Sequence, residues 1–175
     1  MSVIVLTAGH SATDPGAVAA DFTEAEIALE LRDLTAELLR SMGHVVIEDG
    51  ADGDNLPLRY AISLIGQGAI AVELHLNASD NPSAHGVEAI SLPPHRAVAR
   101  QLAQRVASAL RTRVRGDSGW IDQSQSARGR LGYVNGGGVI LETFFLTNPT
   151  ERERYLANPR AVAQAIADVL DEVAT

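Results

Sequence analysis

The sequence contains three short, almost continuous apolar runs, at residues 3–6, 69–74 and 139–141, and these runs constrain the fold more than any other feature. Runs of this kind, rich in β-branched residues, are typical of strands buried on both faces of a parallel sheet. Stretches between them repeat apolar residues every three or four positions, which is the period of a helix. The alternation predicts an α/β fold, a single domain in which a twisted, mostly parallel sheet carries helices on both faces.

The most clearly defined helix is expected from Glu24 to Met42. Thr23 can cap its start and Glu26 stands three positions later, a pairing that forms a capping box. Gly43 follows as a typical C-cap. Further helices are expected at 58–65 and 94–113, and two more begin near Thr150 and Pro159.

The remaining segments are predicted as strands and loops. Residues 44–47 form a further strand, and 86–91 alternate weakly, as in a strand that could lie at an edge of the sheet. Residues 7–20 are interpreted as a loop. Residues 115–138 show no period, and irregular stretches of this length in a compact domain are usually functional.

Composition narrows the function. The chain has 175 residues, 46% of them hydrophobic and 21% charged, which fits one globular domain spanning 1–175. It contains no cysteine, so disulfides, thiolate ligands and cysteine nucleophiles are excluded. A transition-metal site in this chain must therefore use histidine and carboxylate ligands.

The charge of the chain bears on its partners. A formal net charge of −8 argues against nucleic acid, because phosphate neutralisation requires clustered basic residues. One basic stretch, Arg111, Arg113 and Arg115, is followed by Arg128 and Arg130. It is interpreted either as a solvated helix end, the more ordinary explanation, or as a contact with an anionic substrate. No apolar run is long enough to span a bilayer, so no membrane insertion is expected.

A histidine or a glutamate follows each of the three apolar runs. His10 follows the first, His75 the second and Glu142 the third. In an open α/β sheet, ligands bind beyond the carboxyl ends of the strands, so these side chains are expected at one edge. Glu24 begins the helix after the first loop and can reach the same edge.

Two histidines and one carboxylate form a common catalytic zinc shell with one position left for water. Zinc lowers the pKa of that water to about 7, and a further carboxylate can pass its proton to a leaving amine. Glu24 and Glu142 would supply one ligand and one general base, although their spacing does not say which is which. Taken singly, each residue has an ordinary explanation, such as a loop histidine or a glutamate favoured by the helix dipole.

Other polar residues compete for roles. Glu26 is a rival to Glu24, but its capping position gives it a structural task. Glu73 could orient the imidazole of His75 or face solvent at an edge. His85 could line the cleft, whereas His44 and His95 fit structural positions.

Four segments give the chain a family resemblance. They are residues 9–17 (GHSATDPGA), 24–29 (EAEIAL), 75–78 (HLNA) and 141–148 (LETFFLTN), followed by Glu151. In this order and spacing they resemble the zinc-dependent N-acetylmuramoyl-L-alanine amidases of the amidase-3 type, which occur as bacterial autolysins and phage endolysins. The resemblance covers nearly the whole chain.

The resemblance implies a function and a site. His10, Glu24 and His75 would bind one zinc ion per chain, and Glu142 would be the catalytic carboxylate. The substrate would be peptidoglycan, cut at the amide bond between N-acetylmuramic acid and L-alanine. The chain departs from the family at Glu73, usually Ser, at Ala28, usually Asn, and at Thr143, usually Gly, a change that could tighten the site.

Substrate contacts are expected from Asn77, Arg128 and Arg130, since stem peptides carry carboxylates. Asn77 could instead simply brace the loop after His75. Residues 1–6 lack the charged start of a secretory signal. We therefore expect synthesis in the cytoplasm and action on the cell wall after release, as for a phage or prophage endolysin that depends on a holin. The alternatives are a zinc exopeptidase on a related fold and a non-catalytic wall-binding module.

Overall fold

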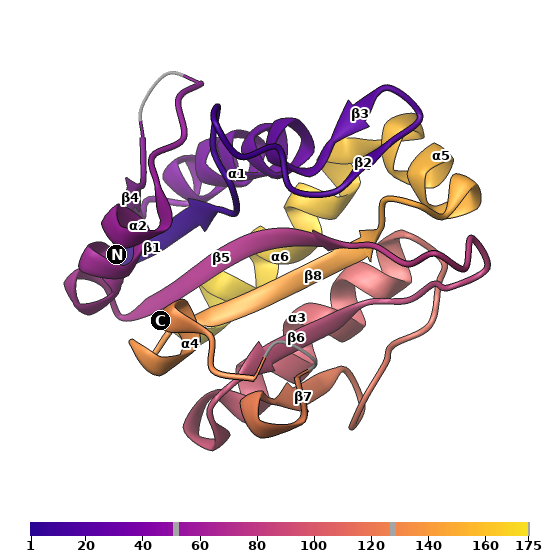
Figure 1. Ribbon diagram of the computed structural model, residues 1–175. Helices are drawn as coiled ribbons and strands as arrows, with labels where there is room; N and C mark the ends of the chain where they lie inside the picture. The colour runs from indigo at the N-terminus through magenta and orange to yellow at the C-terminus, as the bar shows by residue number, and fades with distance from the viewer. Residues whose placement is uncertain (51–52, 127–128, 175) are drawn as a thin grey trace.

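The computed structural model describes residues 1–50, 53–126 and 129–174. Its centre is a six-stranded sheet with the strand order β4-β1-β5-β8-β6-β7 (Figure 1). The first four strands of this order are parallel, β6 is antiparallel to β8, and β7 is parallel to β6. The strands are β1 (Val3–Ala8), β4 (Val45–Glu48), β5 (Ile70–Asn77), β6 (Glu88–Ser91), β7 (Trp120–Asp122) and β8 (Val139–Phe145). The predicted α/β fold with a mostly parallel sheet is confirmed.

Three long helices cover one face of the sheet: α1 (Glu24–Ser41), α3 (Arg96–Ala109) and α6 (Pro159–Ala174) (Figure 1). Leu6, Leu74 and Leu141 of the central strands point into this layer and belong to the larger hydrophobic core. A further helix, α5 (Pro149–Ala157), follows β8. None of the described helices is both long and apolar enough to cross a membrane.

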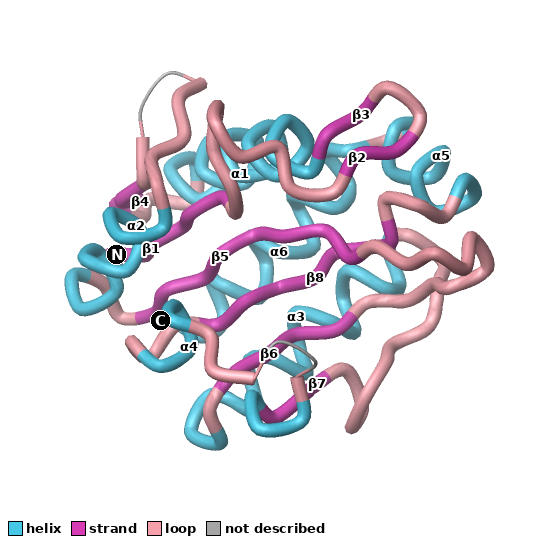
Figure 2. Tube along the Cα trace, in the orientation of Figure 1, coloured by secondary structure: helices cyan, strands magenta, loops and turns pink. Residues whose placement is uncertain are grey.

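The opposite face has a thinner cover. It consists of α2 (Leu58–Leu64), the 3-10 turn η1 (Ile65–Gln67) and the single turn α4 (Gly132–Asn135). Val5, Ala71 and Ile140 pack there with the buried Tyr133 in a smaller core. Helices on both faces are thus confirmed, but on this side the described helices leave the C-terminal ends of β5 and β8 uncovered (Figure 2).

The start of α1 forms as its sequence predicts. Thr23 Oγ1 accepts a hydrogen bond from the backbone N–H of Glu26 at 3.2 Å, and the Glu26 carboxylate accepts from the Thr23 N–H at 3.1 Å. This reciprocal capping box fixes where the helix begins. It therefore also fixes the position of Glu24, the first residue of the helix.

Several segments differ from their predictions. The strand at 88–91 is not at an edge, because β7 pairs with it. The region 115–138, predicted without regular structure, contains three short elements: β7, the turn η3 (Gln123–Gln125) and α4. Each is too short to show a period in the sequence. The loop at 7–20 contributes to a small hairpin of β2 (Val18–Ala19) and β3 (Phe22–Thr23), and the predicted helix at 94–113 is the turn η2 (Pro93–His95) followed by α3.

The strands β5 and β8 also extend beyond their predicted ends. The sequence predicts strands over 69–74 and 139–141, yet His75 and Glu142 lie within β5 and β8 and pair in register. The polar side chains do not end the strands, because they point to the thinly covered face while Leu74 and Leu141 point to the long helices. The predicted site therefore lies on a sheet face near the strand ends and not beyond them.

A buried ion pair joins α1 to the sheet. Arg32 is fully buried, and its Nη1 lies 2.9 Å from Oδ1 of the equally buried Asp49, directly after β4. The same oxygen accepts a hydrogen bond from the Ala8 N–H at 3.3 Å, so the pair also holds the end of β1. Burial raises the pKa of Asp49 to about 6, although Arg32 opposes this shift.

Replacing Arg32 with methionine should lower the free energy of unfolding by about 3–5 kcal/mol near neutral pH, because Asp49 is left buried and unpaired. An acid whose folded pKa is raised stabilises the fold below its unfolded pKa and loses that contribution as pH rises through the folded value. The loss in Arg32→Met should therefore be smaller at about pH 5, where Asp49 takes up a proton, than at about pH 8. Urea unfolding at both values, with the exposed Arg105→Met as control, tests this. Equal losses at the two pH values would contradict it.

Candidate metal centre and active-site cleft

The structure brings His10, Glu24 and His75 together. Each offers a ligand atom, and these atoms lie within 4.8 Å of one another, close enough to share a metal ion. The Glu24 carboxylate lies between the two imidazoles, with Oε2 at 3.0 Å from His10 Nε2 and Oε1 at 2.9 Å from His75 Nδ1. Two histidines that are 65 positions apart in the sequence thus contact the same carboxylate.

Each imidazole contacts a second carboxylate through its other nitrogen. His10 Nδ1 lies 3.1 Å from Asp14 Oδ2, and His75 Nε2 lies 3.1 Å from Glu73 Oε2. A carboxylate at the far nitrogen of a ligating histidine fixes its tautomer and ring orientation. Of the two roles that the sequence leaves open for Glu73, the structure supports the orienting one, since Glu73 is buried. The role of Asp14 was missed, although its spacing of four from His10 gave a signal.

The backbone around the site is shaped to bring these groups close. His10 has a left-handed backbone with φ 68°, and the buried Asn55 amide donates to its carbonyl at 2.9 Å and to that of Gly9 at 3.2 Å. A Cβ atom at Gly9 would lie 2.2 Å from the His75 ring, and one at Gly16 would lie 2.7 Å from Glu24 Oε2. Glycine is therefore required sterically where two loop segments approach the site.

Backbone donors hold the Glu24 carboxylate in place. The N–H of Leu76 donates to Oε1 at 2.9 Å, and that of Ala17 donates to Oε2 at 3.1 Å. Burial favours a protonated Glu24, yet its contacts with His10 and His75 outweigh burial and lower its pKa far below the usual range. Burial likewise favours a neutral His75, but Glu24 and Glu73 raise its pKa well above the usual value. The site is thus a concentration of negative charge around two imidazoles.

These residues fit a divalent metal ion. The donor set of two imidazoles and one carboxylate matches a catalytic zinc shell. His10 Nε2 is buried and makes no hydrogen bond, although it lies 3.0 Å from Glu24 Oε2. A ligand nitrogen that faces a carboxylate without a hydrogen bond is what a shared cation would require.

Glu142 lies beside this group on the neighbouring strand. It pairs in register with His75 of β5 on one side and with Glu88 of β6 on the other. It is half-buried, and its charge contributes to the raised pKa of His75. The next residue, Thr143, is fully buried and donates its hydroxyl to the His75 carbonyl at 2.9 Å. Thr143 therefore ties β8 to β5 at the site.

An open cleft of about 870 Å³ contains the candidate ligands, Glu73 and Glu142. Asn77 lines it, but its amide donates to Glu88 at 3.0 Å and its carbonyl oxygen accepts from the Ala78 N–H at 3.0 Å, which is a bracing arrangement. Arg130 is exposed beside the cleft and does not line it. Arg128 lies outside the described residues. The substrate contacts expected of all three stay predictions.

The other histidines lie elsewhere. His44 is buried, with Nε2 at 2.8 Å from Asp171 Oδ1 of α6, which is a structural contact. His85 lines a different hollow, beside α5, and His95 ends η2. Glu26 serves the capping box, which leaves Glu24 as the carboxylate in the site.

The fold and the cleft together define a class: an α/β domain with the donor set found in zinc hydrolases. A scan against protein families matches residues 4–172 to N-acetylmuramoyl-L-alanine amidase of the amidase-3 type. The chain belongs to this family, whose substrate is peptidoglycan. No curated protein matches it.

Solved structures agree with this family. A Neisseria meningitidis protein assigned as an N-acetylmuramoyl-L-alanine amidase is 36% identical, with a TM-score of 0.90 over 98% of this chain and 94% of that one. The catalytic domain of CwlV, an N-acetylmuramoyl-L-alanine amidase from Bacillus (Paenibacillus) polymyxa var. colistinus, is 24% identical, with a TM-score of 0.83 over 98% and 97%. The catalytic domain of the endolysin CD27L, which targets Clostridia difficile, is 22% identical, with a TM-score of 0.75 over 98% of both chains. The last two share the fold.

Proposed function

We propose that this protein is a zinc-dependent amidase that hydrolyses the bond between N-acetylmuramic acid and L-alanine in peptidoglycan. One zinc ion per chain would be held by His10, Glu24 and His75. The observation that carries the proposal is the Glu24 carboxylate, which lies within 3.0 Å of a nitrogen on each imidazole. Support comes also from the orienting carboxylates and from membership of the amidase family.

The protein's own residues would carry the remaining chemistry. Bound zinc supplies Lewis acidity and lowers the pKa of water. Glu142, one strand away from His75, would take a proton from the attacking water as the new C–O bond forms. It would return that proton to the L-alanine nitrogen as the C–N bond breaks, so that a free amine leaves.

Glu142→Ala should retain zinc and lose about 100- to 10,000-fold in the rate of peptidoglycan hydrolysis, because it removes only the general base. His75→Ala should lose zinc and activity together, because it removes a ligand. Zinc content by mass spectrometry and release of peptides from purified sacculi distinguish the two variants. Full activity in Glu142→Ala would contradict its role as the base.

Glu73→Gln should weaken zinc binding by about 10- to 100-fold, because the amide no longer gives His75 Nε2 a charged acceptor. The matched control is Glu88→Gln, which removes one negative charge from the same cleft without touching either imidazole. Competition with a chelating indicator measures zinc affinity, and thermal unfolding reports stability. Unchanged zinc affinity in Glu73→Gln, or an equal loss in the control, would show that Glu73 does not act through His75.

The two alternative functions find less support. A two-metal exopeptidase needs a second ligand group, and within the described ranges His10, Glu24 and His75 form the single group close enough to bind a metal. A module that only binds the wall has no need of an open cleft beside such a group. Chelator-sensitive release of free stem peptides from sacculi distinguishes the amidase from both.

We also propose that the chain acts as a phage or prophage endolysin that reaches the wall after a holin opens the membrane. The proposal draws on the shared fold of the CD27L domain, which is itself the catalytic domain of an endolysin. Expression in a Gram-negative host should cause lysis when a holin is co-expressed and none without it. Lysis at the same rate in both cultures would contradict dependence on a holin.

A further inference from the structure

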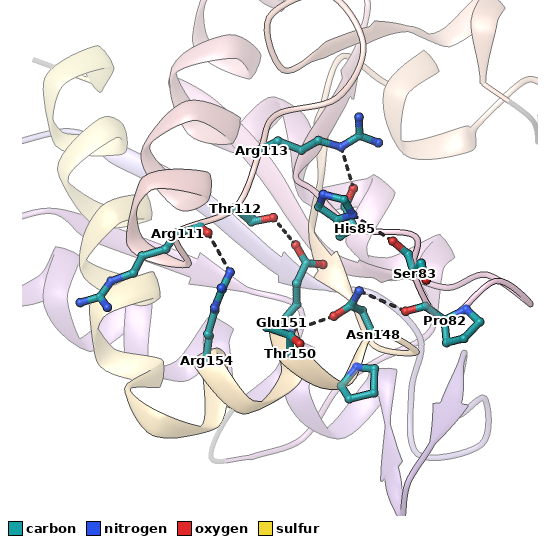
Figure 3. Close-up of a pocket in the computed structure, with 11 residues that line it drawn as sticks. Pro82, Ser83, His85, Arg111, Thr112, Arg113, Asn148, Thr150, Glu151 and Arg154 are labelled. Atoms are coloured by element: carbon teal, nitrogen blue, oxygen red, sulfur yellow. Dashed lines mark hydrogen bonds between the residues drawn. The ribbon is translucent and has the colours of Figure 1, made fainter.

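A second hollow, of about 710 Å³, lies between the end of α3, the loop before β6 and the start of α5 (Figure 3). We call it the basic hollow, because Arg111, Arg113, Arg154 and His85 line it. The chain as a whole carries a net charge of −8, so a cluster of three arginines is opposite in sign to the charge of the whole protein.

The three arginines of the basic hollow differ from most others in the chain. Seven of the described arginines form ion pairs with carboxylates: Arg32, Arg40, Arg96, Arg100, Arg105, Arg115 and Arg160. Among the described residues, Arg111, Arg113 and Arg154 have no carboxylate partner. Arg154 donates instead to the carbonyl of Arg111 at 2.7 Å, and Arg113 Nε donates to that of His85 at 3.3 Å.

The carboxylate that lines the hollow forms no ion pair with these arginines. Glu151 is only 1% exposed, and its oxygens accept from the N–H groups of Phe145 and Gly86, both at 2.9 Å, and from the Thr112 hydroxyl. Its charge is therefore directed at buried donors. The guanidinium groups at the rim remain available to an anion from outside.

The arrangement of the charges indicates what kind of anion fits. Arg111 and Arg113 point away from each other (Figure 3), so they do not form a cage for one compact ion. Arg113 and Arg115 both contact the His85 carbonyl, at 3.3 and 3.5 Å, and Arg115 lines the active-site cleft. The basic hollow therefore adjoins the cleft through Arg115, whose own charge is paired with Glu88. A ligand with carboxylates spaced along a chain would reach Arg111 and Arg113 from the cleft.

We propose that the basic hollow binds carboxylates of a peptidoglycan stem peptide that extends beyond the bond being cut. Guanidinium groups pair well with carboxylates, and such contacts would hold the polymer across both hollows. The inference rests on the proposed function, because a stem peptide lies beside the cleft when the protein binds peptidoglycan for cleavage.

The test measures binding of the inactive Glu142→Gln protein to purified sacculi by co-sedimentation, so that turnover does not interfere. Adding Arg111→Gln and Arg113→Gln should raise the dissociation constant roughly 3- to 30-fold, as expected for two exposed ion pairs. The control pair, Arg105→Gln with Arg160→Gln, makes the same change in net charge at two exposed arginines that do not line the hollow, and it should leave binding unchanged. Thermal unfolding confirms that all variants are folded.

Two further arms identify the ligand. On sacculi whose carboxyl groups have been amidated, the difference between the parent and the hollow variant should disappear. Vesicles containing phosphatidylglycerol should bind neither protein, and inorganic phosphate should not compete with sacculi.

Some contrary outcomes would overturn this inference, and one would contradict the proposed function. Equal binding by the parent and the hollow variant, an equal loss in the control, or a difference that persists on amidated sacculi would overturn the inference. Vesicle binding that needs Arg111 and Arg113 would assign the hollow to a membrane and overturn it too. Failure of the parent itself to bind sacculi would instead contradict the proposed function.

Discussion

The geometry of the site depends on the position of one buried carboxylate. Glu24 is the first residue of α1, and the capping box at Thr23 fixes where that helix starts. Backbone N–H groups from Leu76 and Ala17 hold its two oxygens, and the two imidazoles face the same oxygens. A helix start, a strand end and a loop are thus joined through one side chain. Moving any of the three would separate the candidate ligands, because the Glu24 carboxylate is buried and both of its oxygens are held by these groups.

The unequal helix layers explain why a cleft exists at this place. Three long helices bury one face of the sheet, so β5 and β8 carry leucines on that side. The other face is covered only in part by α2 and α4, and there the same strands carry Glu73, His75 and Glu142. Polar residues can lie within central strands because this part of the face is open to water and to substrate. Stability and chemistry are therefore assigned to opposite faces of the same strands.

Much of the fold could be predicted from sequence because its signals are local. The capping box of α1 and the apolar runs of β1, β5 and β8 depend on neighbouring residues, and the structure confirms them. The short elements β7 and α4 could not be predicted, since three or four residues carry no period and owe their conformation to pairing with β6 and packing on β8. The apolar runs predict the ends of β5 and β8 too early, because the strands continue through His75 and Glu142 on the open face of the sheet.

The sequence predicts which residues form the candidate site, but it does not predict the contacts that orient them. Spacing and family resemblance pointed to His10, Glu24, His75 and Glu142, and the first three converge in the structure. The contacts of Asp14 and Glu73 with the far imidazole nitrogens depend on ring orientation, which no sequence pattern specifies. The support of His10 by Asn55 likewise joins residues 45 positions apart through a loop.

The in-register pairing of His75 with Glu142 makes the position of the proposed general base depend on the alignment of β8 with β5. Successive residues of a strand face opposite sides, so a slip of β8 by one position would turn Glu142 toward the long helices and place Leu141 or Thr143 in the cleft. The Thr143 hydroxyl on the His75 carbonyl opposes such a slip. A chain that folded with this single misalignment would keep its helices and its candidate ligands but lose the carboxylate proposed as the general base.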